Sequence, residues 1–155
     1  MVKGEPKLLR LMAQDAEDLA VISALMQDAV VRLGDITYLP SQRRFALVGS
    51  RFDWLSAEGR KLERRQSGMH FDNVLTVSRL GLDPSRADDM LNLLGILFEE
   101  TQAPAGRVTF TFSGGGTIRL EVECVEAQMR DLGMRWKTRR KPGHVNDESR
   151  AKDTN

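Results

Sequence analysis

The sequence predicts an α+β fold, built mainly from an antiparallel β-sheet or partly open barrel, with one helix near the N-terminus and one C-terminal helix. The clearest observation is the segment 107–126, RVTFTFSGGGTIRLEVECVE, in which apolar and polar residues alternate on both sides of three glycines. A period of two on both arms of a glycine turn predicts a β-hairpin with one buried face and one solvated face.

The second observation is a helical pattern over about residues 16–28. Leu19, Ile22, Met26 and Ala29 recur at helical spacing, which predicts an apolar stripe that packs on the sheet. Asp15 is a favourable N-cap for this helix. The acidic residues of the next turn suit the positive end of the helix dipole.

Six further segments have the composition or the alternation of β-strands. They are residues 7–13, 30–39, 44–54, 62–71, 74–82 and 91–100. The last of these, LNLLGILFEE, is read as a strand because a helix would place Gly95 in mid-span and two glutamates at the negative end of the dipole. Residues 125–132 are predicted to form the closing helix, with Gly133 as its C-cap.

Length and composition indicate one soluble domain. The 155 residues carry 23 basic and 22 acidic side chains, a formal net charge of +1, which gives no general reason to expect nucleic acid or an anionic membrane as a partner. The single cysteine is typical of a reducing compartment, and we expect neither a secretory signal nor a membrane span. We therefore expect a cytoplasmic protein whose domain covers residues 7–141, followed by a disordered polar tail at 142–155.

The sequence offers few candidates for catalysis. A zinc-type site needs several converging ligands, and His70 and His144 are the only histidines, so no metal and no cofactor are predicted. His70 lies in a predicted strand and is the first candidate for any acid–base chemistry. Cys124, in phase with Leu120, is expected to be a buried and unreactive thiol. The three glycines are interpreted as a hairpin turn and not a phosphate loop, because a strand follows them and no lysine is near.

Two basic clusters supply the candidate binding residues. One surrounds the start of a predicted strand, and the other contains a tryptophan and follows the predicted closing helix. They are Arg60, Lys61, Arg64 and Arg65, and Arg135, Trp136, Lys137, Arg139, Arg140 and Lys141. Such clusters can bind a nucleic acid through phosphates and stacking, or an acidic surface of a partner protein, and they are also typical of a solvated surface.

Three segments of the chain are specific enough to indicate relatives. They are QDAVVRLGD, RFDW and GGGTIRLEVEC. With the sequence around them, over about residues 7–142, they resemble an uncharacterised, mainly alphaproteobacterial family, domain of unknown function 2948. The resemblance implies a small cytoplasmic bacterial protein of one domain, and it transfers no catalytic residues because the family has no assigned activity.

The order of predicted elements, with strands after the first helix and a helix at the end, is that of a pleckstrin-homology-like barrel; a helix packed on an open sheet is the alternative. Because no nucleophile, metal cluster or phosphate loop is visible, the first functional hypothesis is a non-catalytic binding or adaptor protein with an unidentified protein partner. A homodimer through an exposed sheet edge is one form of it. The alternatives are a nucleic-acid-associated protein that uses Arg135 to Lys141, and an enzyme with a dispersed site near His70.

Overall fold

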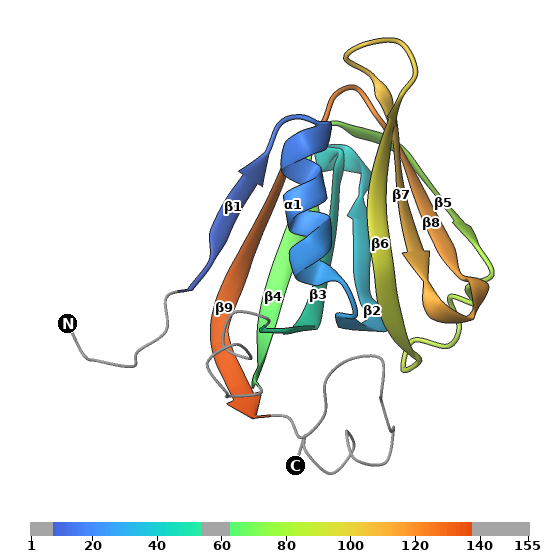
Figure 1. Cartoon of the computed structure of the whole chain (residues 1–155). Coiled ribbons are helices and arrows are strands. Elements are labelled where there is room, and N and C mark those ends of the chain that lie inside the picture. The colour runs from blue at the N-terminus through green and yellow to red at the C-terminus, as the bar shows by residue number, and fades with distance from the viewer. Residues whose placement is uncertain (1–7, 54–62, 138–155) are drawn as a thin grey trace.

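The computed structural model describes residues 8–53 and 63–137 (Figure 1). These residues form one α-helix, nine strands and two short 3-10 turns. In chain order the elements are β1 (Arg10–Ala13), α1 (Ala16–Met26), β2 (Val30–Leu39), η1 (Pro40–Gln42), β3 (Arg44–Phe52), β4 (Glu63–Phe71), β5 (Val74–Leu80), β6 (Met90–Glu100), β7 (Gly106–Phe112), η2 (Ser113–Gly115), β8 (Thr117–Val122) and β9 (Ala127–Lys137). Among the described residues there is no helix with the length and apolarity that a membrane crossing requires.

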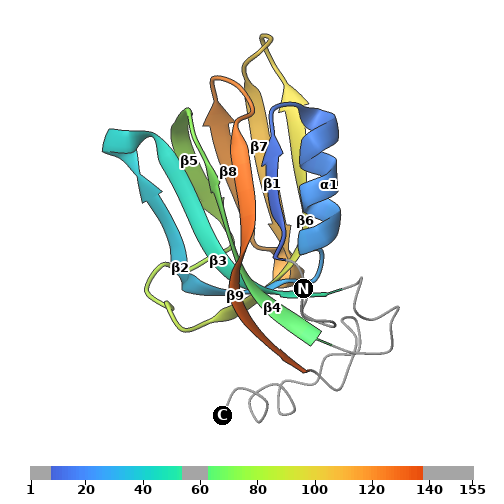
Figure 2. The ribbon, with the colours of Figure 1, turned by 90° about the vertical axis from the view of Figure 1, so that its left-hand side faces the viewer.

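The nine strands form one antiparallel sheet in the order β1-β9-β4-β3-β2-β6-β7-β8-β5. The sheet curls until its two halves face each other, and Figure 2 shows β2, β3 and β9 in front of β5, β7 and β8. Aromatic side chains fill the space between the halves. The ring centroid of Phe110 on β7 lies 5.3 Å from that of Phe45 on β3 and 5.5 Å from that of Phe71 on β4. The expected antiparallel sheet is therefore confirmed, and its core lies inside the curl.

Helix α1 lies between β1 and β6, where the sheet is open (Figure 1). Its predicted stripe is confirmed, because Leu19, Ile22 and Met26 are buried against the core. The predicted N-cap is confirmed as well, because the side chain of Asp15 accepts a hydrogen bond from the Asp18 amide at 2.8 Å. On the sheet side, the Ser23 hydroxyl accepts from the amide of Ile96 at 2.9 Å, which satisfies a backbone donor on an edge of β6 that no strand covers.

The hairpin predicted for residues 107–126 is formed by β7 and β8. Val108, Phe110 and Phe112 are buried and alternate with more exposed residues, and Phe110 pairs with Ile118 across the ladder. Gly114 and Gly115 have φ values of +83° and +92°. Both lie in the left-handed region of backbone conformation, which favours glycine over any other residue. The strand expected at 91–100 is also confirmed, as β6.

The closing helix predicted over 125–132 is wrong, because this part of the chain forms β9. Ala127, Met129 and Asp131 are buried and alternate with the less buried Gln128 and Arg130. β9 pairs with β1 along one edge and with β4 along the other. Alanine, glutamine and methionine favour helices by a few tenths of a kcal/mol each at most, roughly, and two ladders of backbone hydrogen bonds outweigh that preference.

Three expectations that depended on the closing helix, or on a longer β8, also change. Gly133 lies inside β9 with a φ of +90° and is not a helix C-cap. β8 ends at Val122, so Cys124 lies half-buried in the connection to β9 and not on the apolar face of a strand. The comparison with a pleckstrin-homology-like barrel required a helix at the end, so the structure does not support it. What remains is an open, curled antiparallel sheet with one helix.

Candidate functional site

The structure separates the basic residues that the sequence brought together. Arg64 and Arg65 lie on β4 with 3% and 2% of their surface exposed, and so they are not part of an open binding surface. For Arg135, Trp136 and Lys137 the structure describes the strand backbone of β9 and not the side chains. The remaining candidates, Arg60, Lys61, Arg139, Arg140 and Lys141, lie outside the described residues.

Arg64 and Arg65 belong to a buried charge cluster between β3, β4 and β9. The Arg65 Nε donates to Asp53 Oδ2 at 2.7 Å, and the Arg64 Nη1 donates to a backbone carbonyl of β3 at 2.9 Å. A second buried pair lies beside them, in which Nε and Nη2 of Arg51 each donate to a carboxylate oxygen of Asp131 at 2.9 Å. Charges that are buried in this way need close partners, and this cluster supplies them.

Asp131 is the centre of this cluster. In addition to Arg51, its carboxylate accepts from the Ser67 hydroxyl at 2.7 Å and from the Leu9 amide at 2.9 Å. Burial alone would raise the pKa of Asp131, but the hydrogen bonds from Arg51, Leu9 and Ser67 outweigh burial and hold its pKa below the ordinary value. Each carboxylate oxygen already accepts two hydrogen bonds, so Asp131 is a structural anchor between β9, β3 and the chain before β1, and it is not available to a substrate.

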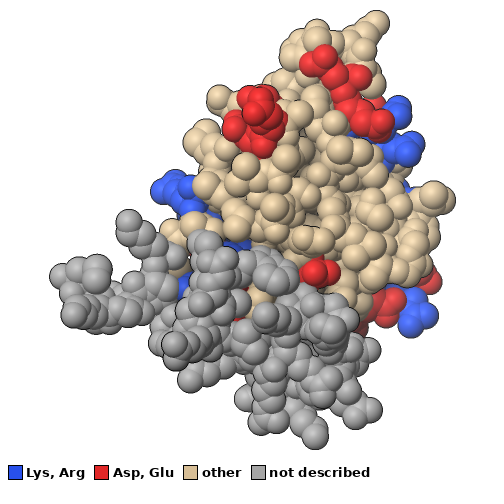
Figure 3. Space-filling view, viewed as in Figure 1, with Lys and Arg blue, Asp and Glu red and all other residues tan. Residues whose placement is uncertain are grey.

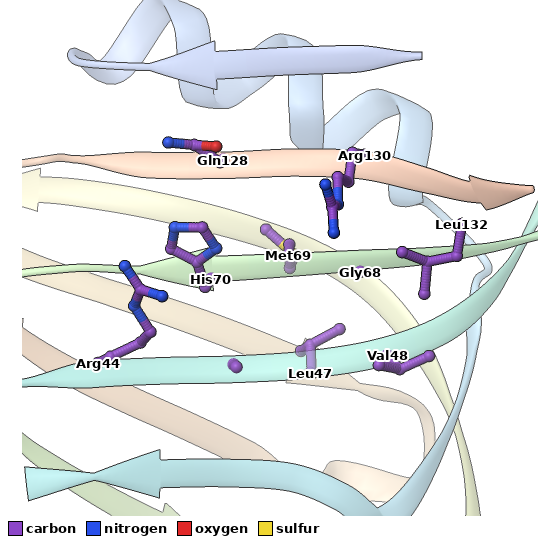
Figure 4. Close-up of a pocket in the computed structure, with 10 residues that line it drawn as sticks. Arg44, Leu47, Val48, Gly68, Met69, His70, Gln128, Arg130 and Leu132 are labelled. Carbon is purple, nitrogen blue, oxygen red and sulfur yellow. The ribbon is translucent and has the colours of Figure 1, made fainter. Parts of the chain in front are cut away.

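A groove lies on the opposite, outer face of β9, β4 and β3 (Figure 4). Its lining follows the strand register: Gln128 is paired with His70 and His70 with Ala46, while Arg130 is paired with Gly68 in the next row. The two small residues leave a hollow of about 420 Å³ between the taller side chains. Arg44, Val48 and Leu132 line its rim.

His70 is the titratable group of this groove. Burial, and then the charge of Arg44, lower the pKa of His70 below its ordinary value. The imidazole is therefore neutral at pH 7. Its Nε2 lies 3.6 Å from Asp72 Oδ2, too far for a hydrogen bond, and with a neutral ring this contact is not an ion pair. Asp72 instead accepts from Arg44 Nε at 2.8 Å.

The groove offers charge and shape without a nucleophile. Cys124 Sγ accepts from Asn73 Nδ2 at 3.5 Å and lines a different hollow beside Phe98, so the described residues contain no Cys–His pair with His70. Nor do these residues contain a group of three histidine, cysteine or acidic side chains that could hold a metal ion. The arrangement around His70 is suited to binding.

A second surface without charge covers the outer side of α1 and β6. The runs Leu19–Met26 and Leu91–Phe98 contain no charged residue. Within them Val21, Leu94 and Leu97 are 54%, 47% and 61% exposed, and Ala20 and Ala24 of α1 are exposed beside them. Figure 3 shows this part of the molecule as a continuous uncharged area, with acidic groups at the upper ends of α1 and β6. These five residues are called the α1–β6 face below.

Sequence reasoning missed both surfaces. For the groove, Gln128 and Arg130 fall in the segment that was predicted to be a helix, and so their pairing with His70 and Gly68, respectively, could not be foreseen. For the α1–β6 face a signal was present in the sequence, because an ordinary surface helix carries charged residues along its exposed side, whereas α1 carries none after Asp18.

The described residues thus form one curled antiparallel sheet and one helix, with a hollow on the outer face of the sheet and an uncharged surface over α1 and β6. The chain belongs to the family described as protein of unknown function (DUF2948), which matches residues 9–144. The resemblance of the QDAVVRLGD, RFDW and GGGTIRLEVEC segments to that family is thus confirmed. No curated protein and no solved structure matches the chain.

Proposed function

We propose that this protein is a non-catalytic binding module that docks a partner protein on the α1–β6 face. The observation that carries the proposal is the exposure of Val21, Leu94 and Leu97 on a helix and a strand that pack together and carry no charge there. Leaving a contiguous apolar area in water costs free energy, roughly 25 cal/mol per Å², and such areas commonly mark contacts with other proteins.

The charges around the face define the partner. Acidic residues lie at the start of α1 and at the end of β6, and they include Glu17, Asp18, Glu99 and Glu100. These two ends lie on the same side of the α1–β6 face (Figure 3). A complementary partner presents an apolar ridge with basic side chains at one end, because a matching charge at the rim guides association and register. We place this contact in the cytoplasm, on the composition of the chain.

The test is a photo-cross-link from the face itself. A photoreactive amino acid replaces Val21 in the full-length chain inside cells, and the matched control carries it at Ser78, which is exposed on β5, three strands from β6 at the edge of the sheet. We expect a defined partner to cross-link from position 21 and not from position 78. The same partner, once purified, should bind the wild-type chain at least about tenfold more tightly than the Val21→Arg or Leu97→Arg variant, while Ser78→Arg binds as the wild type does.

Three outcomes would contradict the proposal. Equal cross-linking from both positions would show that the contact is not on the α1–β6 face. Unchanged affinity of the two arginine variants, with their thermal unfolding also unchanged, would show that the face carries no binding energy. A cross-link between two copies of the chain would identify a homodimer and not a different partner protein.

The hypothesis of a nucleic-acid-associated protein remains a prediction, and fewer basic residues now support it. Arg64 and Arg65 are buried beside β3, so a nucleic acid would depend on the second basic cluster, Arg135 to Lys141. Substituting Arg135 and Lys137 with glutamine should then reduce the salt dependence of binding to single-stranded nucleic acid, and no salt-dependent binding at all would reject this alternative.

A further inference from the structure

Two arginines face each other on the outer side of the sheet, at the β1–β9 pair. Arg10 is the register partner of Arg130. The amide of Asp131 donates to the carbonyl of Leu9 at 2.9 Å, so Leu9 and Asp131 form the hydrogen-bonded pair and the two arginines form the next, non-hydrogen-bonded pair. In such a pair the Cα atoms are only about 4.5 Å apart and the side chains lie closest.

Neither arginine is neutralised. Both are exposed, and in the described part of the chain neither forms an ion pair with an acidic side chain. Like charges directly opposite each other in a sheet are destabilising. An anion between Arg10 and Arg130 would remove that repulsion, because a guanidinium presents its donors in the planar arrangement that a carboxylate accepts.

One member of this charge pair, Arg130, lines the groove described above, and Arg10 is its register partner on the neighbouring strand. Arg130 belongs to both, and Figure 4 shows its guanidinium directed from β9 toward β4, over the position of Gly68. Gly68 provides no side chain there, and Val48 and Leu132 provide apolar walls. The hollow of about 420 Å³ is within the range of small-molecule sites.

We propose that this groove binds a small organic carboxylate, with its carboxylate group on the Arg130 guanidinium, the neighbouring charge of Arg10 adding to the attraction, and its apolar body beside Gly68 against Val48 and Leu132. The site is independent of the α1–β6 face. At the other end of the groove the His70 side chain, which is 24% exposed, lines the hollow and contacts a second group of the ligand.

The same charges exclude a long polyanion. Arg44 is already paired with Asp72, at 2.8 Å, and Glu126 accepts from Asn73 at 2.7 Å on the same side of His70. A nucleic acid that ran along the groove would meet these two carboxylates. Among the described residues at this groove, Arg10 and Arg130 are the arginines without an acidic partner, which suits one or two negative charges.

The test uses the purified full-length protein and three probes: acetate, benzoate and succinate. Binding is followed by NMR shifts of the Gly68 amide and of the Arg130 Nε–H group in a low-salt buffer. We expect at least one probe to cause saturable shifts at both positions, with benzamide, the uncharged analogue of benzoate, causing none. Arg10→Gln and Arg130→Gln should each weaken the probe about tenfold, the loss expected for one charge-assisted hydrogen bond.

Two controls make the result specific to the groove. Arg119→Gln removes an exposed arginine from the other half of the sheet, on β8, and should leave probe affinity unchanged. Gly68→Ala should weaken the probe without harming the fold, because a methyl group there would lie in the hollow at ordinary contact distance, 3.7 Å, from Leu132. Both glutamine variants should unfold at the same temperature as the wild type or higher, because they relieve the repulsion.

The proposal is overturned if none of the three probes gives saturable shifts at Gly68. It is also overturned if benzamide binds as well as benzoate, since charge would then play no role. Equal weakening by Arg119→Gln would show general screening of a basic surface. The last such outcome is that inorganic phosphate binds as tightly as every carboxylate probe, with the same affinity in Gly68→Ala. That result would show that the site binds charge alone and has no apolar part, and it would reject organic carboxylates as the ligand class.

Discussion

The buried ion pair of Arg51 and Asp131 allows a quantitative test of the structure. Their side chains are 2% and 0% exposed, and two parallel hydrogen bonds of 2.9 Å join them. Asp131→Asn keeps the shape of the side chain and removes its charge, which leaves the guanidinium of Arg51 buried without a counter-charge. Breaking a buried pair from one side typically costs about 3–5 kcal/mol of unfolding free energy.

Arg51→Met and the double variant complete a double-mutant cycle, and the double variant should recover most of the lost stability. Arg51→Met leaves the Asp131 carboxylate with donors from Ser67 and Leu9, so we expect a loss near the lower end, about 3 kcal/mol. The double variant contains neither charge and should lie within about 2 kcal/mol of the wild type, because a neutral replacement of a buried pair is often nearly neutral in stability. The two single losses then exceed the loss in the double variant by at least about 4 kcal/mol, and this difference is the coupling energy.

The assay is urea unfolding followed by far-UV circular dichroism, with the slope of the transition checked for constancy. Glu121→Gln is the matched control, because it breaks the pair with Arg107, which has the same 2.9 Å distance but 38% exposure on each side. An exposed pair of this kind contributes about 1 kcal/mol or less. If Asp131→Asn costs no more than Glu121→Gln, or if the two single losses simply add, the cluster is not desolvated and our reasoning is refuted.

The same carboxylate also predicts part of the acid sensitivity. Its pKa is lower in the folded chain than the value of about 3.9 expected in the unfolded chain. The stabilisation is therefore present above the unfolded value and is lost as the pH falls through the folded value. In Asp131→Asn this part of the pH dependence should be missing, and an unchanged acid transition would contradict the assignment.

Two further outcomes are expected. Because the pKa of His70 is lowered on folding, the unfolded chain is protonated first as the pH falls, and the free energy of unfolding decreases below about pH 6.5. In His70→Gln this decrease should be smaller between about pH 7 and pH 5. Parallel curves of unfolding free energy against pH for the two proteins would contradict this prediction. Gly106→Ala should lower the free energy of unfolding by about 1–3 kcal/mol, because the added methyl group would overlap the Phe98 ring. In Gly95→Ala the added methyl group meets its first neighbour only at 3.8 Å, so this variant should lose far less in the same urea assay. Equal losses would show that the chain around Gly106 moves to accommodate the methyl group.

Local patterns were sufficient wherever one face of an element is buried. In the β7–β8 hairpin, alternation and a glycine turn fix both the strands and their register, because a shift by one residue would turn Phe110 out of the core. In α1, the spacing of Leu19 and Ile22 and the cap at Asp15 are contained within one segment of chain. In β6, Gly95 and the closing glutamates oppose a helix by their position alone. These elements need no knowledge of what packs against them.

The sequence by itself therefore determined α1, the strands before β9 and the family, while the tertiary structure decided β9 and every candidate site. Residues 127–132 have good intrinsic helix propensity, and they form a strand because β1 and β4 offer backbone partners on both sides. The opposition of Arg10 to Arg130 joins positions at the two ends of the described chain. Likewise, the sequence places Arg65 in a cluster of basic residues that could form a binding surface, whereas in the fold Arg65 is buried and paired with Asp53. The physical reason is that propensity is a local quantity worth tenths of a kcal/mol per residue, roughly, whereas strand pairing and charge burial depend on which distant segments meet.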